Sequence, residues 1–314
     1  MSYSNILVYV GGELVGDGLI KLPFVYALRD AYPQAKITWC YGEFESVYKG
    51  VLAPLIMSKI DDVVALKELK KQNFDLVIDT QSEWFTTLKL KRSLKYKAFF
   101  SPTLRYLFSD FKPSKGYDAP RRLIDKMLDF LHIIGIKSQN NYKLELAADW
   151  RETARALLPE GKHYIGFAVG AGYRSKCWPR TSYQALAKSL VREGYQPVVI
   201  LGPQEQDWVQ EFKEHLPEAL YPLQDVRVAK QSPLLTIALA ERLRAAVSND
   251  CGIGHMFAAA DTPLVTLFGP TTAEKFAPKV SKARILRAQD FGGETMEAIP
   301  LEAVRKALKE VLFS

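Results

Sequence analysis

Residues 245–268 read AAVSNDCGIGHMFAAADTPLVTLF, and this stretch decides the fold class. Two apolar runs, Ala245–Ser248 and Leu264–Phe268, flank a segment of small residues that becomes helical near Gly252. Short uninterrupted apolar runs are typical of parallel strands buried on both faces, and a helix between two such strands makes a βαβ unit. The stretch therefore predicts part of an α/β domain with a parallel sheet.

The same alternation extends through the second half of the chain. Tyr164–Val169 and Val198–Leu201 are predicted strands, and the helix between them has apolar residues at i, i+3 and i+4 before it ends at Gly194. Leu301–Leu312 has the pattern of an amphipathic terminal helix, which we expect to pack back on the N-terminal domain.

The first half of the chain shows a similar pattern. Its predicted strands are Ile6–Val10, Lys36–Cys40 and Phe74–Asp79. Pro159–Lys162 breaks the chain after a charged helical segment, so we place a domain boundary there. The sequence thus predicts two doubly wound α/β domains, 1–158 and 159–314.

Composition agrees with a globular protein. Of 314 residues, 48% are apolar and 25% are charged, which excludes disordered and collagen-like chains. The three cysteines lie far apart without CxxC spacing, which suits a reducing compartment. The N-terminus lacks the pattern of a signal peptide, and the apolar runs are strand-sized. We expect a cytoplasmic protein whose membrane association, if it has one, is peripheral.

One stretch of the chain is strongly basic. Between Thr86 and Lys126 there are eleven basic residues, Arg121 and Arg122 among them, against three acidic ones. This excess indicates a local anionic partner, although an ordinary solvated surface is the alternative. Aromatic residues are interleaved with the cations, so a nucleic-acid-binding module is a second alternative.

The first predicted strand is followed by a glycine-rich loop, Gly11–Gly18. Its glycine spacing does not fit GxGxxG, which disfavours a nicotinamide dehydrogenase. Asp17 lies where the strand ends and a helix begins, the edge at which open α/β sheets bind ligands. Asp17 is therefore either a ligand-facing carboxylate or a helix cap.

Two further loops have the chemistry of phosphate binding. Residues 170–179, GAGYRSKCWP, offer free backbone N–H groups and two cations after a buried strand; a solvated basic loop is the alternative. In the opening stretch, Asp250 follows a strand, and Gly252 and Gly254 open a helix whose positive end suits a diphosphate. His255 alone is more often a structural histidine. The four histidines lack metal-ligand spacing and no Asp-x-Asp pair occurs, which argues against a metal site.

Taken together, these motifs resemble glycosyltransferase family 9, the ADP-heptose:lipopolysaccharide heptosyltransferases. The GT-B fold of that family implies two Rossmann-like domains facing a central cleft. The resemblance runs nearly end to end. The motifs that carry it are Gly16-Asp17 followed by Pro23, Gly170-Ala171-Gly172 with Lys176 and Trp178-Pro179, Leu201-Gly202-Pro203, Asn249-Asp250-Cys251-Gly252 with His255, and Phe268-Gly269-Pro270-Thr271.

The resemblance implies an inverting transferase that needs no metal or other cofactor and moves a heptose from ADP-heptose to a Kdo or heptose of the lipid A core. Asp17 would be the catalytic base, and Lys176 would grip the donor phosphates. The implied donor-binding residues of the C-terminal domain are Gly170, Ala171, Gly172, Lys176, Glu205, Asp250, Cys251, Gly252, Gly254 and His255. The implied acceptor-binding residues of the N-terminal domain are Gly12, Glu13, Arg121 and Arg122. The anionic acceptor would be met at the inner face of the inner membrane.

The chain departs from the family pattern in two places. Family members usually carry a basic residue and a small hydroxyl residue where this chain has Gly11 and Glu13, which bears on acceptor choice. They also carry Thr or Ser where this chain has Cys251. The altered first loop makes a non-catalytic family member an alternative to an active transferase. A nucleotide-sugar epimerase, which can share the GT-B architecture, is another alternative.

Overall fold

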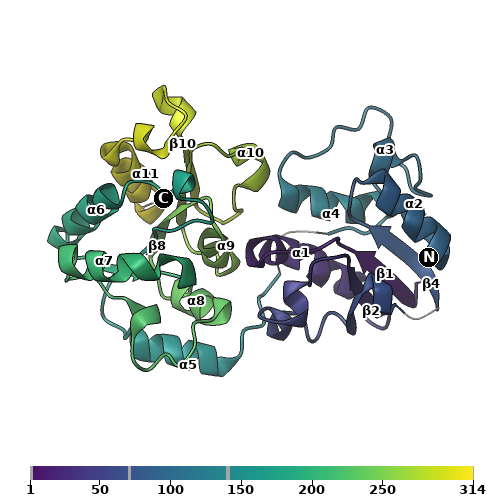
Figure 1. The fold of residues 1–314 in the computed structure, drawn as a ribbon, viewed down its shortest axis with the longest axis horizontal. Helices are drawn as coiled ribbons and strands as arrows, with labels where there is room; N and C mark the ends of the chain where they lie inside the picture. The colour runs from purple at the N-terminus through teal and green to yellow at the C-terminus, as the bar shows by residue number, and fades with distance from the viewer. Residues whose placement is uncertain (1–2, 70–71, 139–141, 314) are drawn as a thin grey trace. The chain divides into compact units, whose positions relative to one another are not determined.

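The computed structural model describes residues 3–69, 72–138 and 142–313, which form two compact units. Unit 1 ends at Glu145 and unit 2 begins at Leu146, so the boundary lies before the predicted one after residue 158 (Figure 1). The reason is helix α5 (Ala148–Leu157), which packs on α8 (Pro233–Ala240) of unit 2. Arg151 of α5 also forms an ion pair with Glu241, with Nε 2.7 Å from Oε2.

Unit 1 is built on a parallel five-stranded sheet. Its strands lie in the order β3-β2-β1-β4-β5. Their bounds are β1 Asn5–Tyr9, β2 Lys36–Tyr41, β3 Asp62–Ala65, β4 Asn73–Asp79 and β5 Lys95–Phe100. The central strand β1 is paired on both sides, with Ile6 beside Ile37 of β2 and Leu76 of β4. The three predicted strands of this half are confirmed.

Helices cover both faces of this sheet. They are α1 (Val15–Ala31), α2 (Trp84–Ser93), α3 (Thr103–Tyr106) and α4 (Leu123–Ile133), with 3-10 turns η1 (Val47–Lys49), η2 (Ala53–Leu55) and η3 (Leu66–Glu68). α1 and α4 pack against each other. Leu90 of α2 is buried in a cluster with Leu7, Val77 and Phe99 of the sheet. An apolar residue of α2 thus attaches this helix to the sheet.

Unit 2 repeats this plan with its own parallel sheet in the order β10-β9-β8-β6-β7. The strands are β6 Tyr164–Ala168, β7 Gln196–Ile200, β8 Ala245–Asn249, β9 Leu264–Phe268 and β10 Ala283–Arg287. Besides α5 and α8, the helices are α6 Arg180–Arg192, α7 Val209–His215, α9 Gly252–Ala259, α10 Ala273–Phe276 and α11 Leu301–Phe313. The short 3-10 turns are η4 Arg174–Lys176, η5 Pro203–Trp208, η6 Pro222–Gln224, η7 Ala288–Phe291 and η8 Met296–Ala298.

The terminal helix α11 lies on the sheet of unit 2. Its buried residues are Val304, Ala307, Leu308 and Val311, and they join the core cluster that also holds Val247 and Val265 of the sheet. The apolar stripe of this helix is thus used within its own unit, and the expected packing on the N-terminal domain stays a prediction. Within the described ranges, no helix is both long and apolar enough to cross a membrane.

Each sheet has one point at which the chain reverses its direction of winding. In unit 1 it lies between β1 and β4, and in unit 2 between β6 and β8. Open α/β sheets bind ligands outside the carboxyl ends of the strands at such points. In unit 1 this edge carries the loop after Tyr9 and the segment after Asp79, and in unit 2 it carries the loops after Ala168 and Asn249.

Candidate active site

An ion pair lies at the switch point of unit 2. Lys176 Nζ is 2.9 Å from Asp250 Oδ2, which joins the loop after β6 to the residue that follows β8. Asp250 is buried, and its backbone N–H extends the strand ladder to Leu267 O at 3.1 Å. The lysine side chain remains partly exposed. The sequence assigned both residues to a donor site, and the structure brings them into direct contact.

Asn249 fixes the loops around this pair. Its Oδ1 accepts hydrogen bonds from Trp178 N and from the Tyr183 hydroxyl, each at 3.0 Å. Its Nδ2 donates to Val169 O at 2.9 Å. A single buried amide therefore holds the ends of β6 and β8 and the start of α6 in one geometry. Sequence reasoning placed Asn249 in the motif but gave it no role of its own.

The first turn of α9 lies directly after Asp250. Gly252 is open, since a Cβ at this position would meet no atom within 4 Å. Gly254 is enclosed, because a Cβ there would lie 2.7 Å from Ser248 Oγ. Cys251 precedes the helix, and burial raises the pKa of its thiol to about 12. His255 lies half-buried within α9. The helix thus presents its N–H groups and the positive end of its dipole next to Asp250.

Glu205 lies against the glycine-rich loop of unit 2. Its carboxylate is buried, accepts a hydrogen bond from Gly202 N at 3.0 Å, and has a pKa that burial raises. A Cβ at Gly170 would lie 2.1 Å from its Oε1, so only glycine leaves room for this carboxylate. Ala171 is also buried, whereas Gly172 faces open space. The predicted contact of Glu205 with a donor ribose remains a prediction.

Arg174, the second cation of this loop, contacts residues outside the loop. Arg174 Nη2 lies 3.0 Å from Asp207 Oδ1, and the guanidinium carbon lies 3.9 Å from the centroid of the Trp208 ring. Lys176 is therefore the cation of this loop that faces Asp250.

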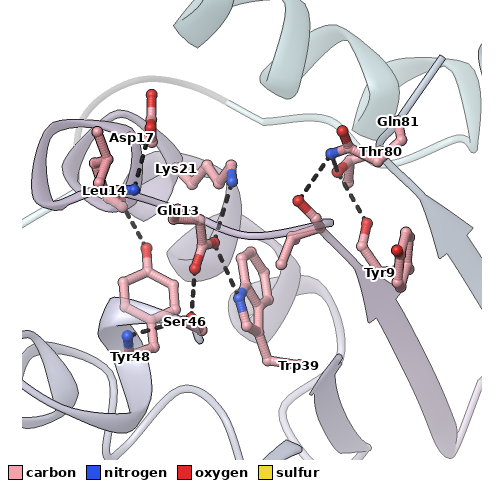
Figure 2. Close-up of polar contacts among 12 residues, drawn as sticks. Tyr9, Glu13, Leu14, Asp17, Lys21, Trp39, Ser46, Tyr48, Thr80 and Gln81 are labelled. Carbon is pink, nitrogen blue, oxygen red and sulfur yellow. Dashed lines mark hydrogen bonds and ion pairs between the residues drawn. The ribbon is translucent and has the colours of Figure 1, made fainter. Parts of the chain in front are cut away.

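In unit 1, Asp17 lies in the first turn of α1 (Figure 2). Its Oδ2 accepts a hydrogen bond from Leu14 N at 3.2 Å, so it caps the helix from its third residue rather than from the capping position itself. The side chain is partly exposed. The geometry is therefore compatible with both interpretations of Asp17, the ligand-facing carboxylate and the cap.

The structure gives the Glu13 side chain partners within unit 1, and its predicted contact with an acceptor stays a prediction. Its carboxylate is buried among three donors, as Figure 2 shows: Oε1 accepts from Lys21 Nζ and Trp39 Nε1, each at 3.1 Å, and Oε2 accepts from Ser46 Oγ. Burying a carboxylate is costly unless it is paired and hydrogen-bonded, and here it is both. Glu13 therefore anchors the first loop inside unit 1.

Gly12, the other predicted acceptor residue of the loop, lines an open groove of about 1500 Å³ in unit 1. The groove follows the carboxyl ends of β1 and β2 and runs along α2. Its basic lining residues are Lys49, Lys67, Lys89, Arg92 and Lys95, and its acidic ones are Glu43, Glu45, Glu68 and Glu83. Part of the basic stretch thus meets the first loop here, whereas Arg121 and Arg122 lie immediately before α4.

Gln81 is a groove residue that the sequence analysis missed. Its Nε2 donates to Val10 O at 2.9 Å, and its own N–H donates to Asp79 Oδ1 at 3.0 Å (Figure 2 shows the Gln81 side chain). Asp79 is fully buried, and desolvation raises its pKa while hydroxyl groups of Thr87 and Ser101 bind its other oxygen. The sequence offered one signal for this segment, because Asp79 is an acidic residue at the carboxyl end of a predicted buried strand.

Two Rossmann-like units, each with polar residues at its switch point, are an architecture that GT-B glycosyltransferases share. The chain belongs to glycosyltransferase family 9 (heptosyltransferase), whose family model matches residues 64–298. It is thus a glycosyltransferase.

Individual relatives agree with the family. Lipopolysaccharide heptosyltransferase 3 of Escherichia coli K12 is 26% identical over 285 residues, covering 82% of this chain and 80% of that protein. Lipooligosaccharide heptosyltransferase 2 of Haemophilus influenzae is 33% identical over 137 residues, a match that spans 43% of this chain and only 39% of the relative's length. The solved structure of E. coli ADP-heptose lipopolysaccharide heptosyltransferase II has a TM-score of 0.70 at 20% identity, covering 98% of each chain, and it supports the fold.

Proposed function

We propose that the protein transfers a heptose from ADP-heptose to a Kdo or heptose of the lipopolysaccharide inner core, with inversion and without a metal or other cofactor. The observation that carries the proposal is the Lys176–Asp250 pair beside the N-terminus of α9. Membership of a heptosyltransferase family and the names of the relatives favour the sugar and the acceptor.

On the donor side, positive groups of unit 2 would stabilise the negative charge of the leaving diphosphate. When ADP leaves the anomeric carbon, negative charge develops on its diphosphate, and preorganised positive groups stabilise that charge most effectively. Lys176 supplies a full positive charge, and Asp250 holds its ammonium in place at 2.9 Å. The open backbone at Gly252 supplies N–H groups at the positive end of a helix. The diphosphate would bind between these two.

The acceptor side requires a base. A single inverting displacement needs one group that takes the proton from the attacking hydroxyl. Asp17 Oδ2 is occupied by Leu14 N–H, so Oδ1 is the oxygen proposed to take that proton. The groove lined by Gly12, Lys89 and Arg92 offers cations to the acidic sugars of the acceptor. Arg121 and Arg122 stay predicted acceptor contacts.

One experiment tests the proposal directly. The purified protein is incubated with ADP-heptose and a panel of truncated lipopolysaccharide acceptors, and the products are identified by mass. Addition of one heptose to a single acceptor class is the expected result. Conversion of the donor to its epimer without an acceptor would identify an epimerase, and an unchanged donor with every acceptor would identify a non-catalytic family member.

A further inference from the structure

The Tyr9 hydroxyl is a polar group at the edge of an apolar cluster. Tyr9 ends β1, and its ring belongs to the buried cluster that also holds Leu7 and Phe99. The residue is only 6% exposed, yet it lines the groove of unit 1. Within the described ranges, no residue forms a hydrogen bond with this hydroxyl, whereas buried polar groups are generally hydrogen-bonded. The hydroxyl is therefore available to a molecule that occupies the groove.

The backbone of two glycines shows where this hydroxyl lies. A Cβ at Gly42 would be 2.7 Å from the Tyr9 hydroxyl oxygen and 2.7 Å from Gly11 O. The Gly42 N–H donates to that carbonyl at 2.6 Å, which joins the segment after β2 to the first loop. Both glycines line the groove. The hydroxyl thus lies against bare backbone where the first loop meets the groove.

Gln81 provides a second polar atom at the same place. Its Nε2 donates to Val10 O at 2.9 Å and to Thr80 Oγ1 at 3.2 Å, so both amide hydrogens are used and the amide has one orientation (Figure 2). No described residue donates a hydrogen bond to its Oε1. A Cβ at Gly11 would lie 3.3 Å from this oxygen. The Tyr9 hydroxyl and Gln81 Oε1 therefore both border the first loop.

Carboxylates border this end of the groove. Glu43 and Glu45 follow β2, Glu83 follows β4, and all three side chains are exposed. The nearby cation Lys49 is already paired, because its Nζ lies 3.5 Å from Glu45 Oε1. Burial, with nearby negative groups such as Glu83, raises the pKa of Tyr9 to about 12, so its hydroxyl keeps the proton in neutral solution. This end of the groove therefore disfavours an anion.

Cations line the groove farther along α2. Lys89 and Arg92 lie on α2, and Lys95 begins β5. Because α2 starts after the carboxyl end of β4 and returns to the start of β5, these residues are displaced from the first loop toward the opposite ends of the strands. An elongated acceptor can thus place neutral hydroxyl groups at the first loop and its negative groups along α2.

We propose that the Tyr9 hydroxyl and Gln81 Oε1 bind hydroxyl groups of a neutral acceptor sugar. A sugar hydroxyl both donates and accepts, so it can donate to the amide oxygen and accept from the tyrosine. An ionised carboxylate only accepts, so it would face Gln81 Oε1 without a proton between them. Of the two acceptor sugars in the proposed function, heptose is neutral and Kdo carries a carboxylate, so this subsite selects heptose. The inference deepens the proposed function and rests on it for the identity of the acceptor.

Binding is tested first, on the full chain and without a donor. The probes are a methyl heptoside and the methyl glycoside of Kdo, each titrated and followed by saturation-transfer NMR. We expect the heptoside to bind at least about fivefold more tightly, because only its hydroxyl groups satisfy both polar atoms. Tyr9→Phe keeps the ring in the apolar cluster and removes one hydrogen bond, so it should weaken heptoside binding about 3- to 10-fold.

Tyr96→Phe is the matched control, because it makes the same chemical change in the same cluster. Tyr96 lies on β5 and packs against that cluster, but it is not one of the described residues that line the groove. This variant should bind both glycosides as the unmodified protein does. Its melting temperature shows how much the loss of a hydroxyl disturbs the cluster itself.

Transfer kinetics separate substrate binding from a structural role. With ADP-heptose and a heptose-terminated lipopolysaccharide, Tyr9→Phe should raise KM for the acceptor by the factor seen in binding. The kcat and the KM for the donor should stay nearly unchanged, because the lost contact is made to the bound acceptor in the ground state and the transition state alike. A merely structural role would lower the melting temperature and change the donor kinetics as well.

Several results would overturn the inference. They are binding of the Kdo glycoside as tightly as the heptoside, binding of neither glycoside, and heptoside binding that Tyr9→Phe leaves unchanged. Equal losses in Tyr9→Phe and Tyr96→Phe also overturn it, because they would come from the cluster rather than from the groove.

Failure of this subsite and failure of the proposed function give different results. Heptoside binding that depends on Tyr9, by a protein that transfers no sugar from ADP-heptose, supports the subsite and rejects the proposed function. Transfer to a lipopolysaccharide acceptor with a KM that Tyr9→Phe leaves unchanged supports the proposed function and overturns the subsite.

Discussion

Replacing Glu13 by Gln should destabilise unit 1 by about 3 to 5 kcal/mol, because the Lys21 ammonium would stay buried without its counter-charge. In the folded protein, Lys21 Nζ lies 3.1 Å from Glu13 Oε1, and the two side chains are 8% and 0% exposed. Gln has the same length and keeps an oxygen that accepts from Trp39 Nε1. The loss of stability therefore reports mainly the missing charge.

The double variant separates this charge effect from a general disturbance of the loop. Glu13→Gln with Lys21→Met removes both charges, so most of the loss should be recovered, to within about 2 kcal/mol of the unmodified protein. Hydrogen exchange of the β1 amides, Asn5–Tyr9, measures the free energy of opening in unit 1 alone. Asp62→Asn is the matched control, because the Lys36–Asp62 pair is about half exposed and should be worth less than about 1 kcal/mol.

Two results would refute this reasoning. A single Glu13→Gln variant whose β1 amides open with nearly unchanged free energy would show that the pair contributes little. Equal losses in the single and double variants would show that the Glu13 side chain matters for its shape and hydrogen bonds rather than for its charge.

Three further outcomes follow from the two sites. Asp17→Asn keeps an oxygen for the helix cap, so stability should barely change, whereas loss of the general base should lower kcat at least about 100-fold; turnover within a few-fold of the unmodified enzyme would leave only the capping role. Lys176→Ala removes a charge-assisted contact worth about 1.5 to 3 kcal/mol, so kcat/KM for the donor should fall about 10- to 150-fold; unchanged donor kinetics would reject this role. Cys251→Ser places a stronger hydrogen-bond acceptor before α9 and should stabilise unit 2 by about 1 kcal/mol, or about 2 to 4 °C in the melting temperature, with donor affinity retained. An unchanged or lower melting temperature would show that the hydroxyl does not cap the helix.

The strands that the sequence did not reveal share a place in the fold. β3, β5 and β10 all lie at sheet edges, and they are short or carry charged residues such as Lys95 and Arg284. Edge strands meet solvent and need charges to discourage further pairing, so they lose the apolar run that marks a central strand. β7 is also an edge strand but was predicted, because the segment at Leu220 pairs with its outer side and keeps it buried.

Among the site residues, too, some roles could be predicted from the sequence and others could not. The opening motif and the loop of Lys176 could be assigned to one site, because both follow strands that a parallel sheet brings to a common edge. The contact between Lys176 and Asp250 agrees with that reasoning. The role of Glu13 could not be predicted, because its partners Trp39 and Ser46 come from segments whose burial depends on tertiary packing.

The close approach of Glu205 to Gly170 has a consequence for how this loop can diverge among relatives. Since a Cβ at position 170 would lie 2.1 Å from the Glu205 carboxylate, the two positions share one volume. A larger residue at position 170 requires a smaller one at position 205, so the two positions should covary across the family. We therefore expect relatives that keep the glutamate to keep the glycine as well.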